Sequence, residues 1–401
     1  MLVEEGEKRQ KVREAVCKRW SIMPTLDVER MIEWKKRSNL GKRVSENMHV
    51  PWSHHAPASN PHYDTLPAGA ASHIALVGIE PESGLTLIQE IIESATTSLW
   101  IEMYLFDNDF IAQMLLKQKA IHHGLDLRLL YHQPDLPPSL DPTGRRHFPA
   151  WATQNKAVRT DGQPVAVPHA KFLLVDADVP GKARAYIMTA NFTAQALGGN
   201  RAGNANREYI VCDTNPDDIA QLKAIFLADA AGHALPALPV SSNLVISDIN
   251  ALSFIPLVLR TARQSLAIQV EYLNDPPGDG ALNLKKILLY AAKNGVSVQI
   301  MLPPLSPAAP GVSSADNNET YRILSPLVAV NVTPRYFIHA KMIIADQRLA
   351  FVGSQNLSHQ SLHFSREVGI LISNTSVVTR LLATFHADWK DAQDRASCHR
   401  R

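Results

Sequence analysis

Residues 169–176 read His-Ala-Lys-Phe-Leu-Leu-Val-Asp, and residues 339–346 read His-Ala-Lys-Met-Ile-Ile-Ala-Asp. The aliphatic residues in each stretch predict a buried strand. Residues two apart on a strand point to the same face, so each histidine is expected to share a face with its lysine. The aspartate, seven positions after the histidine, falls on the opposite parity. Asp176 and Asp346 are therefore expected to brace the end of the strand or turn.

Both motifs belong to a longer internal repeat. Residues 98–107, SLWIEMYLFD, match residues 265–274, SLAIQVEYLN, and GLDLRLLY from position 124 matches GVSVQIML from position 295. Further on, the Arg-Glu pair that ends at Glu208 matches the pair that ends at Glu367, and IFLAD before residue 230 matches TFHAD before residue 389. Each copy predicts a strand, a helix, a strand, the motif strand, a second strand, a glutamate strand and a closing helix. Apolar runs without alternation are typical of strands buried on both faces, so we expect a duplicated α/β fold.

The repeat divides the chain into four predicted parts. Residues 76–230 and 244–395 form two similar domains, and the Pro-rich residues 231–243 link them. Residues 1–75 form a helical and loop extension with a basic beginning. Two readings of that basic stretch stay open, a membrane-surface helix and a solvated helix that packs on the main body through its tryptophans; the second is favoured. A group of polar residues in its Pro-rich part lacks any metal-ligand spacing, so we expect no metal there: His54, His55, His62 and Asp64.

The bulk composition limits the class of protein. The 401 residues carry a formal net charge of only +2, with 45% hydrophobic and 19% charged residues, which is typical of a globular protein and argues against a broad DNA-coating face. The three cysteines show no C-x-x-C spacing, so neither a zinc ribbon nor a disulfide framework is expected. No apolar run is long enough for a transmembrane helix, and the first residues lack the apolar core of a signal peptide. The chain is expected to be cytoplasmic, with peripheral membrane contact and export left open.

Polar residues also recur after each motif. The next strand carries a hydroxyl and a carboxamide two positions apart, Thr189 with Asn191 and Ser354 with Asn356. Lysine supplies positive charge, hydroxyl and amide groups supply hydrogen-bond donors, and histidine supplies a nucleophile or an acid. A glutamate on the far ring nitrogen would fix the tautomer of the histidine. The pattern predicts a duplicated phosphate site with these residues: His169, Lys171, Thr189, Asn191, Glu208, His339, Lys341, Ser354, Asn356 and Glu367.

Two simpler interpretations of the motif residues compete with this site. Histidines satisfied within a core would not need matching partners at repeat-consistent positions. A second copy that has lost its function would be expected to lose some of its polar residues, yet every residue type survives in both copies. Both interpretations are therefore disfavoured.

The chain resembles the phospholipase D superfamily with its paired HKD motifs, in the bacterial phospholipase D and cardiolipin synthase-like branch. The second copy, HAKMIIADQRLAFVGSQNLSHQSLHFSREVGIL, is the closer match. The first copy has Met-Thr-Ala before Asn191 and an insertion after Asp176. The resemblance implies two α/β units related by pseudo-twofold symmetry, with both motifs in one central active site. The altered first copy is where a particular specificity is expected.

The resemblance also implies a mechanism and the residues that carry it. His169 would attack phosphorus to form a covalent phosphohistidine, and His339 would protonate the leaving alcohol and then activate water or an acceptor alcohol. Four side chains would hold the phosphate oxygens: Lys171, Lys341, Asn191 and Asn356. Neither a metal nor another cofactor is expected.

We expect a metal-independent phosphodiesterase or phosphatidyltransferase that acts on phospholipids as a monomer. The alternative is a nuclease or nucleic-acid phosphodiesterase of the same superfamily, since the same chemistry serves any phosphodiester. A non-enzymatic scaffold that binds phosphate is a third interpretation. No basic stretch interleaved with aromatic residues is present, which favours the lipid substrate.

Overall fold

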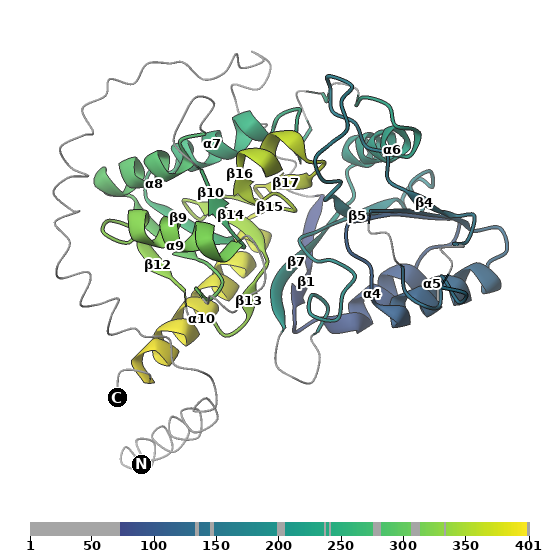
Figure 1. The fold of residues 1–401 in the computed structure, drawn as a ribbon, viewed down its shortest axis with the longest axis horizontal. Helices are drawn as coiled ribbons and strands as arrows, with labels where there is room; N and C mark the ends of the chain where they lie inside the picture. The colour runs from purple at the N-terminus through teal and green to yellow at the C-terminus, as the bar shows by residue number, and fades with distance from the viewer. Residues whose placement is uncertain are drawn as a thin grey trace, which may run out of the picture.

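The computed structural model describes residues 73–132, 136–144, 148–198, 205–235, 238–239, 242–275, 282–305, 313–332 and 334–398 (Figure 1). The extension predicted for residues 1–75 lies outside these ranges except for its last three residues, and so do the four polar residues in which no metal site was expected. We call residues 74–235 the first half and residues 242–398 the second half. The exact domain boundaries stay a prediction.

The first half is built on a mixed sheet in the order β1-β7-β6-β5-β2-β3-β4. The central pair β2 and β3 is parallel, and β5 runs antiparallel to β2. The strands are β1 (Ile74–Glu80), β2 (Ser98–Met103), β3 (Asp126–Tyr131), β4 (Ala152–Gln154), β5 (Lys171–Val175), β6 (Arg184–Met188) and β7 (Asn206–Asp213). The helices are α4 (Gly84–Glu93), α5 (Asp109–Ile121) and α6 (Pro216–Ala231).

The second half repeats this plan in a sheet of the order β12-β11-β9-β14-β15-β17-β8. A short parallel pair, β10 with β16, lies beside it. The strands are β8 (Leu244–Ile246), β9 (Ser265–Val270), β10 (Leu273–Asn274), β11 (Ser297–Met301), β12 (Ala329–Asn331), β13 (Phe337–Ile338), β14 (Lys341–Ala345), β15 (Leu349–Gly353), β16 (Leu357–Ser358) and β17 (Val368–Ile372). The helices are α7 (Ala251–Thr261), α8 (Leu284–Lys293), α9 (Ser313–Leu324), the π-helical turn η2 (Gln360–Phe364) and α10 (Thr375–Cys398).

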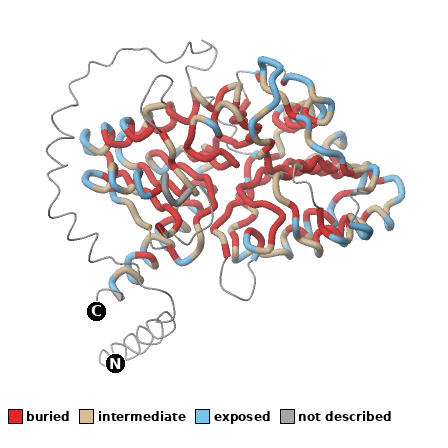
Figure 2. Tube along the Cα trace, in the orientation of Figure 1, coloured by how far each residue is buried: buried red, intermediate tan, exposed pale blue. Residues whose placement is uncertain are grey.

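One hydrophobic core is shared by the two halves. The inner faces of both sheets pack together with α6 and α10 in a single cluster, whereas the outer faces are covered by α4 and α5 in the first half and by α7 and α8 in the second. Figure 2 shows the buried chain running continuously through both halves. Strands β2 and β9 are buried after their first residue, as their unbroken apolar runs predicted. The predicted duplicated α/β fold is confirmed.

Helix α6 illustrates how local sequence sets the boundaries of an element. The side chain of Asn215 accepts a hydrogen bond from the backbone of Asp217 at 3.0 Å, Pro216 occupies the first turn, and Gly232 ends the helix with a φ of 73°. Polar caps, an early proline and a left-handed glycine are the usual boundary signals. The helix carries Asp229, which binds Arg366 of the second half.

Each half also lends a short segment to the other. Strand β13, just before His339, pairs in parallel with β7 of the first half. In the same way Pro168, just before His169, forms a parallel bridge with Arg366 of the second half. The two histidines therefore enter the structure beside the Arg-Glu pair of the opposite half. They directly precede the motif strands, which begin at the lysines. The expected shared face of each histidine and its lysine stays a prediction.

Asp176 and Asp346 lie where the motif strands turn back. Both have positive φ values, 48° and 51°. The carboxylate of Asp176 accepts hydrogen bonds from the backbone of residues 96, 97 and 98, and that of Asp346 accepts from residues 263, 264 and 265. These bonds tie each turn to the start of the neighbouring central strand, away from the histidines.

Candidate active site

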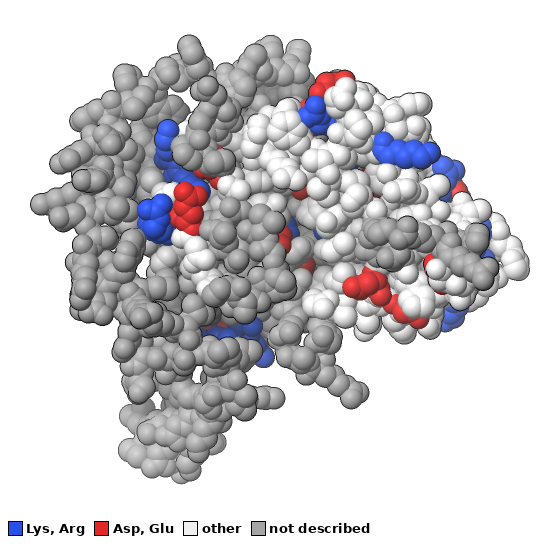
Figure 3. All heavy atoms as spheres, in the orientation of Figure 1, with Lys and Arg blue, Asp and Glu red and all other residues white. Residues whose placement is uncertain are grey.

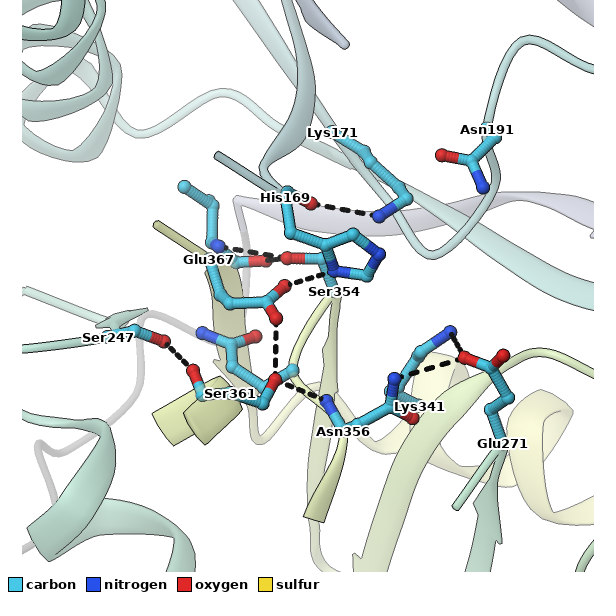
Figure 4. Close-up of polar contacts among 12 residues, drawn as sticks. His169, Lys171, Asn191, Ser247, Glu271, Lys341, Ser354, Asn356, Ser361 and Glu367 are labelled. Atoms are coloured by element: carbon cyan, nitrogen blue, oxygen red, sulfur yellow. Dashed lines mark hydrogen bonds and ion pairs between the residues drawn. The ribbon is translucent and has the colours of Figure 1, made fainter. Parts of the chain in front are cut away.

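The predicted polar residues of the two copies meet between the sheets. Figure 4 shows His169, Lys171 and Asn191 of the first half facing Lys341 and Asn356 of the second half. The histidine side chains are only slightly accessible, with exposed fractions of 13% for His169 and 11% for His339. Two positions that lie 170 residues apart in the sequence thus contribute to one site.

The histidine–glutamate pairs cross between the halves. Nδ1 of His169 lies 2.7 Å from Oε2 of Glu367, and Nδ1 of His339 lies 2.6 Å from Oε1 of Glu208. Both glutamates are buried. A carboxylate on Nδ1 holds that nitrogen as the proton-bearing one and leaves Nε2 for chemistry. The crossing follows from the exchanged segments, because each histidine is placed beside the other half's glutamate strand.

The two motif lysines bend back over the histidines. Nζ of Lys171 donates to the carbonyl oxygen of His169 at 2.8 Å, and Nζ of Lys341 donates to that of His339 at 2.5 Å. Burial lowers the pKa of Lys171 to about 7, although the nearby Glu367 opposes the shift. Both ammonium groups lie within the site, where an anion would satisfy them.

The two asparagines also lie at the site, but with different partners. Oδ1 of Asn191 accepts a hydrogen bond from the backbone of Leu105 at 3.3 Å, which leaves its NH₂ group directed away from that backbone. Nδ2 of Asn356 donates to Oε2 of Glu271 at 3.0 Å. Amide donors of this kind suit phosphate oxygens.

Thr189 and Ser354 form hydrogen bonds within the protein. Both are completely buried. The Thr189 hydroxyl donates to Oε2 of Glu208 at 2.5 Å and accepts from the backbone of Tyr209. The Ser354 hydroxyl exchanges hydrogen bonds with the backbone of Val368. These hydroxyl groups hold the glutamate strands, and their role in binding phosphate stays a prediction.

Two further residues of the second half were not predicted from the sequence. The Ser361 hydroxyl donates to Oε1 of Glu367 at 2.5 Å and accepts from the backbone of Asn356, so it positions both (Figure 4). Glu271 follows β9 and lies 3.1 Å from Nζ of Lys341. The repeat holds the one available signal, because Glu271 aligns with Tyr104 of the first copy. The Tyr104 ring meets the His169 ring at 4.5 Å between centroids.

The protonation of the two halves is unequal. Burial and the neighbouring lysines hold the pKa of His169 well below its ordinary value. Burial raises the pKa of its partner Glu367 to about 7. The pKa of Glu208, by contrast, is lowered despite its burial, because His339 and Lys341 lie close and Thr189 donates to it. The first histidine is thus favoured as the neutral ring, and the second pairs with an ionised carboxylate.

A second exchange between the halves surrounds the site. Nε and Nη2 of Arg207 bind the carboxylate of Asp388 at 2.7 Å each, and Nε of Arg366 binds the two oxygens of Asp229 at 3.1 and 3.0 Å. Arg207 and Arg366 precede the two glutamates in the sequence. Bidentate arginine–carboxylate pairs have a fixed geometry, so these pairs set how the halves meet.

A pocket of about 310 Å³ opens beside His169. Its lining includes Pro168, which precedes that histidine, and His132, whose ring stacks on Tyr104 at 5.6 Å. Most of its wall is apolar and comes from residues 157–168 of the first half. The pocket is thus mainly apolar and reaches the residue that precedes His169.

The described residues also limit which other kinds of site the molecule holds. Within them, no group of three or more His, Cys, Asp or Glu side chains is arranged to hold a metal ion. None of the helices described is both long enough and apolar enough to cross a membrane. In the described part of the face that Figure 3 shows, lysine, arginine and acidic side chains lie scattered among other residues.

Comparison with known proteins identifies two copies of one domain. The family model described as "Cardiolipin synthase, PLD-like domain" matches residues 88–230 and 257–389, which is more than half of the chain. Cardiolipin synthase 1 of Staphylococcus epidermidis is 21% identical over 336 residues, covering 75% of this chain and 64% of the relative. The cardiolipin synthase of Alkalihalophilus pseudofirmus is 31% identical over 131 residues, covering 33% of this chain and 25% of the relative. These matches span between a quarter and two thirds of the relatives.

Solved structures share the fold at low sequence identity. Phosphatidylserine synthase of Haemophilus influenzae matches with a TM-score of 0.59 and 16% identity, covering 82% of this chain and 88% of that one. Polyphosphate kinase of Porphyromonas gingivalis matches with a TM-score of 0.54 and 13% identity, covering 79% and 47%. Both likenesses concern the duplicated fold, since unrelated chemistries can share one fold.

Proposed function

The chain belongs to the phospholipase D superfamily, in the cardiolipin synthase-like family of domains, and from this premise we propose that it transfers or hydrolyses the phosphatidyl group of a phospholipid through a phosphohistidine. The observation that carries the proposal is the pair of crossed histidine–glutamate contacts, which place two imidazoles in one site with two lysines. A double displacement needs such a pair, because one ring must attack as the neutral base and the other must donate a proton.

In the first proposed step, Nε2 of His169 forms a bond to phosphorus. The bond between phosphorus and the leaving alcohol breaks, and that oxygen takes the proton from Nε2 of His339. Glu367 stabilises the positive charge that develops on the His169 ring, because it lies 2.7 Å from Nδ1. Lys171, Lys341 and the side-chain amides hold the phosphate oxygens in this scheme.

In the second proposed step, water or an acceptor alcohol attacks phosphorus. His339, now neutral, takes the proton of the incoming hydroxyl, and the bond between phosphorus and Nε2 of His169 breaks with its electron pair returning to the ring. The starting protonation of both histidines is thereby restored. The two lysines supply the positive charge that a metal ion supplies in other phosphodiesterases, so we propose that no metal takes part.

A phospholipid is favoured over a nucleic acid by three observations. The family and the similar curated proteins carry the name cardiolipin synthase. The pocket lined by Pro168, which precedes His169, is mainly apolar. Charges on the face shown in Figure 3 are mixed, whereas nucleic-acid binding relies on clustered positive charge. Because both histidines lie in one chain, we propose that a monomer is active, with peripheral contact to the membrane that holds its substrate.

The proposal is tested by offering phosphatidylcholine or phosphatidylglycerol vesicles and single-stranded DNA in parallel, with EDTA present throughout. We expect turnover of phospholipid that survives chelation and is absent in His169→Ala. An added alcohol separates the two activities, since a transferase forms a new phosphatidyl ester and a hydrolase releases phosphatidic acid. Cleavage of DNA without turnover of lipid would favour the alternative substrate, and activity retained in His169→Ala would exclude the mechanism.

A further inference from the structure

Glu271 is an acidic residue of the site that lies outside both repeated motifs. Its Oε2 atom lies 3.1 Å from Nζ of Lys341, 3.0 Å from Nδ2 of Asn356 and 3.6 Å from Nε2 of His339. The contact with His339 is within ion-pair range but too long for a hydrogen bond, so Glu271 does not hold the Nε2 proton in a hydrogen bond. With Glu208 on Nδ1, the His339 ring is flanked by a carboxylate on each nitrogen.

Among the described residues of the first half, the equivalent position carries no acid. Tyr104 stands at the repeat position of Glu271 and presents a neutral ring to His169, with Nζ of Lys171 lying 5.3 Å from the centre of that ring. Glu271 therefore gives the duplicated site a difference of one full charge between its halves. The neighbouring Lys341 and His339 hold the pKa of Glu271 below its ordinary value, so this carboxylate is ionised at neutral pH.

We propose that Glu271 is a positioning residue whose negative charge keeps His339 as the imidazolium, and thereby assigns the acid role to the second half and the nucleophile role to His169. This inference rests on the proposed two-step chemistry and adds what breaks the symmetry of the repeat. The motifs themselves cannot do so, because both read His-Ala-Lys and both histidines have a crossed glutamate.

The other charges around His339 do not by themselves favour its imidazolium. The titratable groups that contact it or act on it are Glu208 on β7, Lys341 on β14, Glu271 after β9, and His169 just before β5. Without Glu271, the one carboxylate, Glu208, would stand against the Lys341 ammonium group. With it, two carboxylates face one ammonium group, so that a proton added to His339 is stabilised by an acid on each side of the ring.

The inference predicts a shift in the ionisation of one histidine. In Glu271→Gln the amide can still accept hydrogen bonds from Lys341 and Asn356, but the charge is gone. The midpoint of the His339 titration, followed by NMR of protein labelled with ¹⁵N-histidine and assigned with His339→Asn, should then fall by about one pH unit, a tenfold change in proton affinity. Glu319→Gln is the matched control, because Glu319 also pairs with a lysine of the second half, at 3.3 Å from Nζ of Lys285.

The rate of turnover gives a second readout. If His339 is the acid, the alkaline limb of the pH–rate profile should move to lower pH by the same amount in Glu271→Gln. A merely structural role would lower the rate equally at all pH values. An unchanged or higher His339 midpoint in Glu271→Gln would overturn the inference.

The titration needs no turnover, so it is separate from a failure of the proposed function. Absence of phospholipid turnover by the wild-type chain would refute the proposed two-step chemistry, whatever the titration shows. If Glu271→Gln does not fold, Glu271→Tyr places the residue of the first half at this position and is expected to show the same downward shift. A His339 midpoint that does not move in that variant would equally refute the role of Glu271.

Discussion

Replacing Arg366 with methionine should destabilise the protein in a way that depends strongly on pH. The guanidinium group is completely buried and reaches from the second half into the first, where it binds Asp229 and the carbonyl oxygen of Val158. The backbone carbonyl of Arg366 also accepts from the backbone of His169. Removing one partner of a buried ion pair leaves an uncompensated charge, which costs about 3–5 kcal/mol.

The pH dependence follows from the acids that remain. Burial raises the pKa of Asp229 to about 6 even beside the arginine, and it raises the pKa of the adjacent Glu102 well above its ordinary value. A carboxyl group whose pKa is higher in the folded state than in the unfolded chain binds more protons when folded. Folding stability therefore falls as pH rises from about 4 through the folded pKa. Without Arg366 this fall is steeper, because nothing compensates the Asp229 carboxylate.

Urea unfolding followed by circular dichroism measures the effect. Arg366→Met should lose about 3–5 kcal/mol at pH 7.5 but only about 1–2 kcal/mol at pH 5.0, where protonated Asp229 leaves mainly lost hydrogen bonds. The double variant Arg366→Met with Asp229→Asn removes both charges and should recover about 2 kcal/mol at pH 7.5. Equal losses at both pH values, or no recovery in the double variant, would refute the reasoning.

Two further predictions concern the hydrogen bonds that hold the histidines. Glu208→Gln should slow the release of a poor leaving group such as choline by about a hundredfold, because choline needs a proton from His339. A nitrophenol leaving group needs no such proton, so its release should be slowed much less. Equal losses for phosphatidylcholine and the phosphatidyl nitrophenol ester would count against this role. Thr189→Val should lower kcat about tenfold at constant KM, because it removes the hydrogen bond to Glu208 at 2.5 Å. A rise in KM at constant kcat would instead support the predicted phosphate-binding role of the hydroxyl.

The repeat in the sequence was sufficient to predict the duplicated α/β fold. Local patterns carry this information, since apolar runs and a recurring motif are visible in one dimension. They do not report how the copies face each other. Glu208 and Glu367 were expected at the site, but their exchange between the histidines depends on the segments at Pro168 and β13, which pair with the opposite half.

Two contacts of the site could not be predicted from the sequence. Strand parity puts Thr189 and Asn191 on one face, yet it does not reveal that the glutamate strand lies close enough to take the hydroxyl. Glu271 was not predicted because its position in the repeat carries Tyr104, so the comparison of the copies gave no matching residue type there. In a duplicated site, the positions that differ between the copies are the ones that can make the two halves unequal.

The most direct test of the account is to locate the phosphatidyl adduct. The His339→Asn variant should form the intermediate from a phosphatidyl nitrophenol ester but release it slowly, because the residue that activates water is gone. Mass spectrometry of peptides from the trapped protein then identifies the modified residue. We predict that the phosphatidyl adduct lies on His169. An adduct that forms on His339 in His169→Asn but never on His169 in His339→Asn would contradict it.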